Sequence, residues 1–184
     1  MNTSNKQTLD LAIDISGLHF SWDGQGPVLE IERLQIKRGE RVFVEGPSGS
    51  GKSTLLSLIA GVITPQRGTL KVNGKHINTL NGSSRDRFRA DHIGFIYQMF
   101  NLIPYLSVIE NVTLSCRFSS RRRFRATGRA SGYDTEAMRL LNKLGMDDPV
   151  VIKKSVTELS VGQQQRVAAA RALIGGPEVL LADE

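Results

Sequence analysis

The sequence Gly46-Pro47-Ser48-Gly49-Ser50-Gly51-Lys52-Ser53 fits the pattern G-x-x-x-x-G-K-[ST]. It lies between a short apolar segment, 41–45, that we expect to be a strand and a segment, 52–63, with the apolar periodicity of a helix. Glycines let the backbone fold around an anion, and the start of a helix attracts negative charge. The pattern therefore predicts a nucleotide-phosphate site, the alternative being a glycine-rich turn with a chance lysine. It does not choose among kinase, GTPase and ATPase.

The last two residues of this loop have separate expected roles. Lys52 would reach the β- and γ-phosphates, and the Ser53 hydroxyl would bind Mg²⁺. Thr54 follows directly and is included among the predicted nucleotide-binding residues.

Strand patterns alternate with helix patterns along the rest of the chain. Strands are predicted at 11–20, 28–36, 69–72, 93–97 and 179–182, and helices at 133–144 and 163–174. The fold class we expect is α/β, with a mostly parallel core sheet, an N-terminal antiparallel β part and a helical subdomain at about 100–160. The whole of 1–184 is expected to form one domain of this kind.

The chain of 184 residues has a net charge of +6, and its positive charge is concentrated in one place. Six arginines between 117 and 129, with no acidic residue among them, account for the excess of 24 basic over 18 acidic residues. This pattern disfavours a nucleic-acid footprint over the whole protein and favours a local contact. One cysteine, Cys116, excludes an internal disulfide framework, and the longest apolar stretch is too short to cross a bilayer.

An apolar run near the end of the sequence, 179–182, is followed by Asp183 and Glu184. A buried strand that ends in aspartate beside a phosphate loop is how P-loop enzymes hold Mg²⁺. Asp183 is therefore the predicted metal carboxylate, and Glu184 would orient or deprotonate the attacking water.

A further motif, Leu159-Ser160-Val161-Gly162-Gln163, closely resembles the L-S-G-G-Q signature of the ATP-binding cassette (ABC) ATPases. Gln98 matches the Q-loop of that family, and the phosphate loop, Q-loop, signature and acidic strand end stand in the family order. The resemblance covers about 11–184 and implies a P-loop NTPase fold, ATP and Mg²⁺ as ligands, and ATP hydrolysis.

The resemblance also assigns roles to residues. It implies that Ser160, Gly162 and Gln163 bind the γ-phosphate of ATP held by a second copy, so that a homodimer forms around ATP. Lys52, Gln98 and Glu184 would be catalytic, with Ser53, Gln98 and Asp183 serving Mg²⁺. Val161 departs from the usual glycine, and because β-branched residues disfavour positive φ, we predict φ below zero there, with the side chain directed away from the phosphate.

Trp22 stands where the family places an aromatic residue that stacks on adenine. The alternative is a strand-end aromatic that packs on the core.

The segment Phe95-Ile96-Tyr97-Gln98-Met99-Phe100-Asn101-Leu102-Ile103-Pro104 resembles the macrolide-exporter and lipoprotein-releasing (MacB/LolD) group of ABC ATPases. Amino-acid importers carry a similar F-N-L-x-P segment. Either branch implies a separate transmembrane permease, which the segment after Gln98 would face, and a cytoplasmic location at the inner face of the cell membrane.

The arginine-rich segment has two interpretations. Blocks of like charge are often solvated and mobile, which predicts a mobile insertion. The alternative is contact with anionic lipid head groups or an acidic partner loop.

Two rival functions also stay open. One is a soluble ABC ATPase that acts on nucleic acid or ribosomes, and the other is a structural module that uses ATP only to dimerise. Because the family continues past Glu184 with further motifs, we also expect this chain to be a fragment, marginally stable and weakly active by itself.

Overall fold

The computed structural model describes residues 10–23, 26–129 and 131–183. They form two compact units that divide between Asn81 and Gly82, here called unit 1 and unit 2. Glu184, the predicted water-activating residue, lies outside the described residues.

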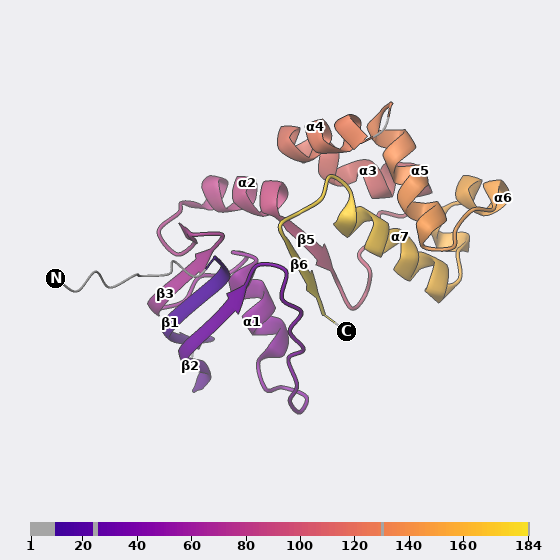
Figure 1. The fold of residues 1–184 in the computed structure, drawn as a ribbon. Coiled ribbons are helices and arrows are strands. Elements are labelled where there is room, and N and C mark those ends of the chain that lie inside the picture. Colours follow the sequence, from indigo (N-terminus) through magenta and orange to yellow (C-terminus); the bar gives the residue numbers. More distant parts are fainter. Residues whose placement is uncertain (1–9, 24–25, 130, 184) are drawn as a thin grey trace. The chain divides into compact units, whose positions relative to one another are not determined.

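Unit 1 is built on a four-stranded antiparallel sheet with the order β2-β1-β3-β4 (Figure 1). Its strands are β1 (Leu11–Ser21), β2 (Pro27–Lys37), β3 (Arg67–Val72) and β4 (Lys75–His76). Asn73 and Gly74 join β3 to β4 with φ of +49° and +75°, as a type I′ hairpin turn requires. The predicted strands at 11–20, 28–36 and 69–72 are confirmed.

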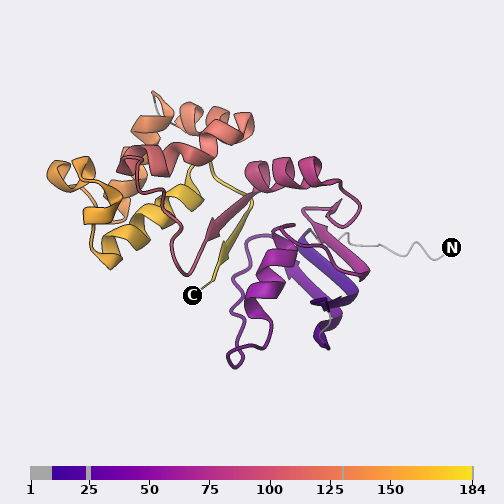
Figure 2. The same cartoon turned by 180° about the vertical axis from the view of Figure 1, so that it is seen from behind.

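The helix of unit 1, α1 (Lys52–Ile59), lies beside this sheet in both views (Figures 1 and 2). It buries Leu55, Leu58 and Ile59, and it ends earlier than the predicted residue 63. Gly61 explains the early end, because its φ of +68° is a left-handed conformation that stops a helix.

The strand predicted at 41–45 is not formed, so this prediction is wrong. Residues 40–47 have no regular structure, and the side chains of Val42, Phe43 and Val44 are 48%, 88% and 39% exposed. A strand needs a neighbour for its backbone N–H and C=O groups, and no described strand pairs with this segment. An apolar pattern by itself does not supply that neighbour.

Unit 2 contains a parallel strand pair, β5 (Ile93–Ile96) and β6 (Val179–Ala182). Ile93 pairs with Val179 and Ile96 with Ala182, so both strands end at the same edge. The helix α2 (Gly82–His92), which the sequence analysis does not predict, leads directly into β5. The α/β class and the antiparallel N-terminal part are confirmed, and within the described residues the parallel part consists of this pair.

Six helical elements make up the rest of unit 2 (Figure 2). They are α3 (Val108–Phe118), α4 (Ser120–Arg129), α5 (Tyr133–Lys143), α6 (Pro149–Lys153), the 3₁₀ turn η1 (Val156–Glu158) and α7 (Val161–Leu173). Their common core contains fully buried side chains from α3, α5 and α7, among them Val112, Leu141 and Val167. The helices predicted at 133–144 and 163–174 are confirmed within two residues.

Candidate functional site

The phosphate loop of unit 1 requires glycine for two reasons that the structure makes visible. Gly51 has φ of +88°, and a Cβ added there would lie 2.9 Å from Cδ2 of Leu29 on β2. A Cβ added at Gly46 would lie 2.7 Å from Oγ of Ser50. The loop therefore turns sharply beside β2 and leads into α1, and there is little room for a side chain at Gly46 or Gly51.

The start of α1 is arranged to receive an anion. No side chain caps the helix at Gly51, and the first turn contains no acidic residue, so nothing in that turn neutralises the positive end of the helix dipole. Lys52 Nζ donates to the carbonyl oxygens of Gly46 and Pro47 at 2.8 and 2.9 Å, which places the ammonium group over the loop. Ser53 is exposed in the same turn, and Thr54 follows it. A phosphate group at this site would meet backbone N–H groups and a lysine.

Trp22 lies just after β1 and is partly packed and partly exposed. Its ring meets Phe20 edge to face, with centroids 4.9 Å apart, while 45% of the residue stays exposed. Ser21 pairs with Pro27, and Val28 of β2 approaches Gly51, so Trp22 and the phosphate loop lie near the same stretch of β2. Packing at the end of the strand is therefore observed, and stacking of Trp22 on adenine stays a prediction.

Gln98 and Asp183 come together at one edge of the strand pair in unit 2. Asp183 follows β6 directly, and its backbone N–H donates to the carbonyl oxygen of Ile96, the last residue of β5, at 3.0 Å. Gln98 lies two residues after Ile96 and is exposed, whereas Asp183 is half-buried. The parallel register therefore places Gln98 and Asp183 after the same ends of the two strands, and their role toward Mg²⁺ stays a prediction.

The signature residues form the start of α7. Ser160 is the N-cap, and its side chain accepts from the N–H of Gln163 while the Gln163 side chain accepts from the N–H of Ser160 at 2.9 Å. Ser160 is exposed, and open space surrounds the position of a Cβ at Gly162. Val161 is not among the residues with positive φ and is 71% exposed, so the predicted negative φ is confirmed.

Two residues that the sequence analysis did not single out hold the segment after Gln98. Arg171 of α7 donates to the carbonyl oxygens of Phe100 and Asn101. Asn111 of α3 is fully buried, donates to the carbonyl oxygen of Ile103 and accepts from its N–H at 2.8 Å. The sequence signal for Asn111 and Arg171 is a polar residue within an apolar helical pattern. Such a residue is buried when the helix packs, and a buried polar group needs a hydrogen-bond partner.

Residues 120–129 of the arginine-rich segment form a helix, α4, whereas Arg117 lies on α3, and the interpretation as a mobile insertion is wrong. Arg122 is only 2% exposed and donates to the carbonyl oxygens of Ala172, Ile174 and Ile93. The first two carbonyls belong to the end of α7, where a cation is favoured by the helix dipole. Burial lowers the pKa of Arg122 to about 10, so the group keeps its charge at neutral pH.

A carboxylate in the turn before β6 binds two further arginines of α4. Glu178 Oε1 accepts from Arg121 and Arg125, each at 2.7 Å, and Oε2 lies 3.1 Å from Nδ1 of His92. Arg125 also donates to the carbonyl oxygen of Gly176 at 2.8 Å. The charge of α4 thus serves largely to attach this helix to the strand pair and to the end of α7.

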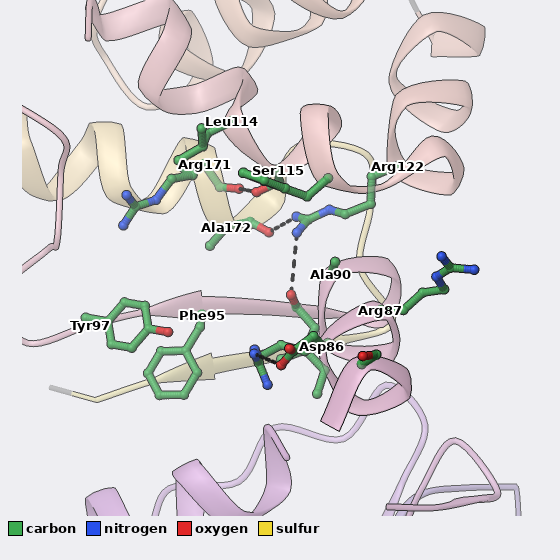
Figure 3. Close-up of a pocket in the computed structure, with 14 residues that line it drawn as sticks. Asp86, Arg87, Ala90, Phe95, Tyr97, Leu114, Ser115, Arg122, Arg171 and Ala172 are labelled. Carbon is green, nitrogen blue, oxygen red and sulfur yellow. Dashed lines mark hydrogen bonds and ion pairs between the residues drawn. The ribbon is translucent and has the colours of Figure 1, made fainter. Parts of the chain in front are cut away.

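Unit 2 contains a cavity of about 610 Å³ between α2, the strand β5 and the helices α3 and α7 (Figure 3). Its wall combines rings and cations, with Phe95 and Tyr97 stacked at 4.2 Å. Other lining residues are Arg87, Leu114, Phe118, Arg122 and Arg171. Phe95 of β5 and Tyr97, the residue before Gln98, line the cavity, so a ligand there would contact the chain next to Gln98.

The comparison with known families decides the identity, because a family model described as ABC transporter matches residues 29–184. The chain belongs to the ABC transporter family. Similar proteins include the ABC transporter ATP-binding protein YtrE of Bacillus subtilis (strain 168), 39% identical over 162 residues, covering 88% of this chain and 66% of that protein. The macrolide export ATP-binding/permease protein MacB of Bdellovibrio bacteriovorus is 38% identical over 94% of this chain and 25% of its own length.

Solved structures of ABC cassettes have the same fold. The dimeric structure of MJ0796, a bacterial ABC transporter cassette, matches with a TM-score of 0.79 at 36% identity, covering 94% of this chain and 73% of that chain. A dimeric post-hydrolysis state of MJ0796 bound to ADP and Pi matches with a TM-score of 0.76 at 34% identity. The P-loop NTPase fold and the resemblance to MacB are therefore confirmed. The chain spans just under two thirds of YtrE and a quarter of MacB.

In the part of the chain that the structure describes, no helix is long and apolar enough to cross a bilayer. Among the same residues, no group of three His, Cys, Asp or Glu side chains could hold a metal.

Proposed function

We propose that this ABC protein is the ATP-hydrolysing subunit of a transporter. ATP binding would pair two copies, and hydrolysis would release them and drive a separate membrane permease from its cytoplasmic side. The observation that carries this proposal is the presence of two exposed helix starts, at Lys52 and at Ser160, in a chain similar to dimeric cassettes. Each helix start attracts an anion, and one triphosphate can occupy both when they come from different copies.

The phosphate loop would hold the β- and γ-phosphates. The backbone N–H groups of residues 46–53 and the ammonium group of Lys52 supply hydrogen bonds and charge, since Lys52 already points over the loop. Lys52 would exchange its two carbonyl partners for phosphate oxygens, which are stronger acceptors because they are charged. Trp22 would stack on the adenine with its exposed part.

Mg²⁺ fits the donor groups proposed for it. Ser53, Gln98 and Asp183 offer hydroxyl, amide and carboxylate oxygens, the hard ligands that this ion prefers, and a single carboxylate leaves positions for phosphate oxygens and water. Bound there, the ion would neutralise charge that develops on the phosphates. The amide of Gln98 and the carboxylate of Asp183 follow the same ends of β5 and β6. Glu184 would accept a proton from the attacking water.

The signature end of α7 would complete the site of the partner copy. Ser160 and Gly162 are exposed, and the open space at Gly162 lets a phosphate approach the backbone closely. The Ser160–Gln163 capping box keeps this turn ordered before the partner arrives, which lowers the entropy lost on binding.

The permease would dock at the cavity beside β5. The aromatic and basic wall formed by Tyr97, Phe118 and Arg87 suits a short amphipathic segment with an acidic side chain. This position next to the segment after Gln98 supports transmission of movement between nucleotide and permease. The internal binding of Arg121, Arg122 and Arg125 weakens the rival function of nucleic-acid binding, because their donors already have protein acceptors.

Steady-state ATP hydrolysis by the complete protein, with and without Mg²⁺, tests the proposal. We expect turnover that requires Mg²⁺ and that Lys52→Ala reduces by at least about a hundredfold. The substitution removes the ammonium group that would stabilise the negative charge on the phosphates in the transition state. The matched control is Lys75→Ala on β4, which should keep normal turnover. Mg²⁺-independent turnover, or equal turnover in the wild type and Lys52→Ala, would contradict the proposal, whereas ATP-dependent pairing without turnover would favour the structural module.

A further inference from the structure

Two consecutive residues after Gln98 have a backbone conformation that side chains rarely adopt. Phe100 has φ of +58° and Asn101 has φ of +49°. In the described ranges Asn73 is the one other non-glycine residue with positive φ, and it lies in a hairpin turn that favours it. Asparagine tolerates this conformation, but for phenylalanine it costs on the order of 1–2 kcal/mol. Two local hydrogen bonds form this turn, from the N–H of Phe100 to the carbonyl oxygen of Tyr97 at 2.9 Å and from the N–H of Asn101 to that of Met99 at 2.6 Å, and interactions from outside the segment add to them.

Arg171 provides these interactions. Its guanidinium donates through Nη1 to the carbonyl oxygen of Asn101 at 2.6 Å and through Nη2 to that of Phe100. Consecutive residues in a helical conformation of either hand turn their carbonyls to the same side, whereas in an extended chain they alternate. The planar fork of arginine has two donors on one side, which suits two carbonyls that point the same way. Arg171 is 9% exposed, so water competes little for these hydrogen bonds.

Arg171 lies in the same helix as the signature residues, so its contact with Phe100 and Asn101 links the signature to the segment after Gln98. α7 has 13 residues, about 20 Å, with the signature at its first turn and Arg171 in its last turn. The carbonyl oxygen of Arg171 also accepts from Oγ of Ser115 on α3, which fixes this end of the helix in unit 2. One rigid helix therefore joins the signature to the segment that begins two residues after Gln98.

We infer that Arg171 is a positioning residue that couples the signature helix to Gln98 by holding Phe100 and Asn101 in their left-handed conformation. The inference rests on the proposed function, in which Gln98 serves Mg²⁺. Arg171 acts through the backbone of these two residues, and a shift of α7 when the signature meets a nucleotide would pull on that backbone. Gln98 would then respond to the partner copy.

The test compares Arg171→Met and Arg171→Lys with the wild type in the complete protein, measuring kcat, the KM for ATP and the Mg²⁺ concentration at half-maximal turnover. We expect Arg171→Met to lower kcat about tenfold and to raise the half-maximal Mg²⁺ concentration several-fold. The KM for ATP should stay within about twofold, because the phosphate loop lies in unit 1. Arg171→Lys should be intermediate, since one ammonium group cannot reproduce the fork.

A matched control and a rescue separate positioning from folding. Arg117→Met removes an exposed arginine from α3 and should change none of the three quantities. Phe100→Gly removes the cost of the left-handed conformation at the residue that bears it, so it should recover part of the kcat lost in Arg171→Lys. This double variant keeps a cation at 171 and stays informative if Arg171→Met fails to fold.

Three outcomes are decisive. A higher Mg²⁺ requirement with unchanged KM, together with the glycine rescue, supports the inference. Wild-type kcat and Mg²⁺ dependence in folded Arg171→Met overturn it, as does a loss of kcat that follows the loss of folded protein by circular dichroism with no change in Mg²⁺ dependence. Absence of Mg²⁺-dependent hydrolysis in the wild type is a different result, because it contradicts the proposed function itself.

Discussion

Replacing Glu178 with glutamine should weaken unit 2 in a way that depends on pH. The Glu178 side chain is 18% exposed and accepts from Arg121 and Arg125 while facing His92. Burial alone would raise the pKa of Glu178, but the hydrogen bonds from Arg125 and Arg121 and the nearby His92 outweigh burial and lower it from 4.5 to about 2. Glu178→Gln keeps the size of the side chain and removes its charge.

The size of the effect follows from linkage between protonation and folding. A carboxylate whose pKa is lower in the folded state stabilises the protein above its unfolded pKa, and this contribution is lost as pH falls through the folded value. A difference of 2.5, taken from 4.5 and 2, corresponds to about 3 kcal/mol at pH 7. The contribution should fall to roughly 2 kcal/mol at pH 3.5 and to nearly zero at pH 2.

Urea denaturation of the complete protein followed by far-UV circular dichroism measures this difference, because most of the described helices lie in unit 2. We expect Glu178→Gln to be about 3 kcal/mol less stable than the wild type at pH 7, with the gap closing as pH falls. Glu32→Gln on β2 is the control, since this carboxylate is exposed, and it should change stability by less than about 0.5 kcal/mol. A constant gap between the wild type and Glu178→Gln from pH 7 to pH 3.5 would refute the reasoning.

Three further substitutions have expected results of different kinds. Arg122→Met should cost about 3 kcal/mol in urea denaturation, because three carbonyl oxygens lose a buried charged donor; a loss no larger than that of the exposed Arg123→Met would be inconsistent with this. Ser160→Ala should destabilise by about 1 kcal/mol through loss of the N-cap and should weaken ATP-dependent pairing; unchanged pairing would remove Ser160 from its proposed role. Trp22→Ala should raise the Kd for ATP about tenfold in a fluorescent-nucleotide titration while Trp22→Phe does not; equal Kd values would leave Trp22 as a packing residue only.

The sequence predicts well wherever a pattern depends on neighbours in the chain. The loop at 46–53 follows from glycine conformations, and the helices predicted at 133–144 and 163–174 follow from apolar periodicity, and both signals are local. Gln98 and Asp183 were paired by family resemblance, and their common strand edge agrees with that pairing.

The sequence predicts poorly wherever a partner is distant. The segment 41–45 has a strand pattern but no described strand beside it, and the pattern cannot supply one. The arginines of α4 suggested a solvated surface, because a charge run does not reveal that Arg122 meets carbonyls 50 and 52 residues away. The role of Arg171 does not follow from the sequence for the same reason, because the carbonyl oxygens that it binds lie about 70 residues earlier.

The mass of the complete Glu184→Gln protein in solution, measured by light scattering with and without ATP, tests the central claim most directly. This substitution slows hydrolysis and so preserves any paired state, if Glu184 activates water as proposed. We predict the mass of one copy without nucleotide and of two copies with ATP, and a return to one copy when Gly162→Asp places a negative charge where the partner's phosphate should lie. The mass of a single copy at saturating ATP would contradict the account.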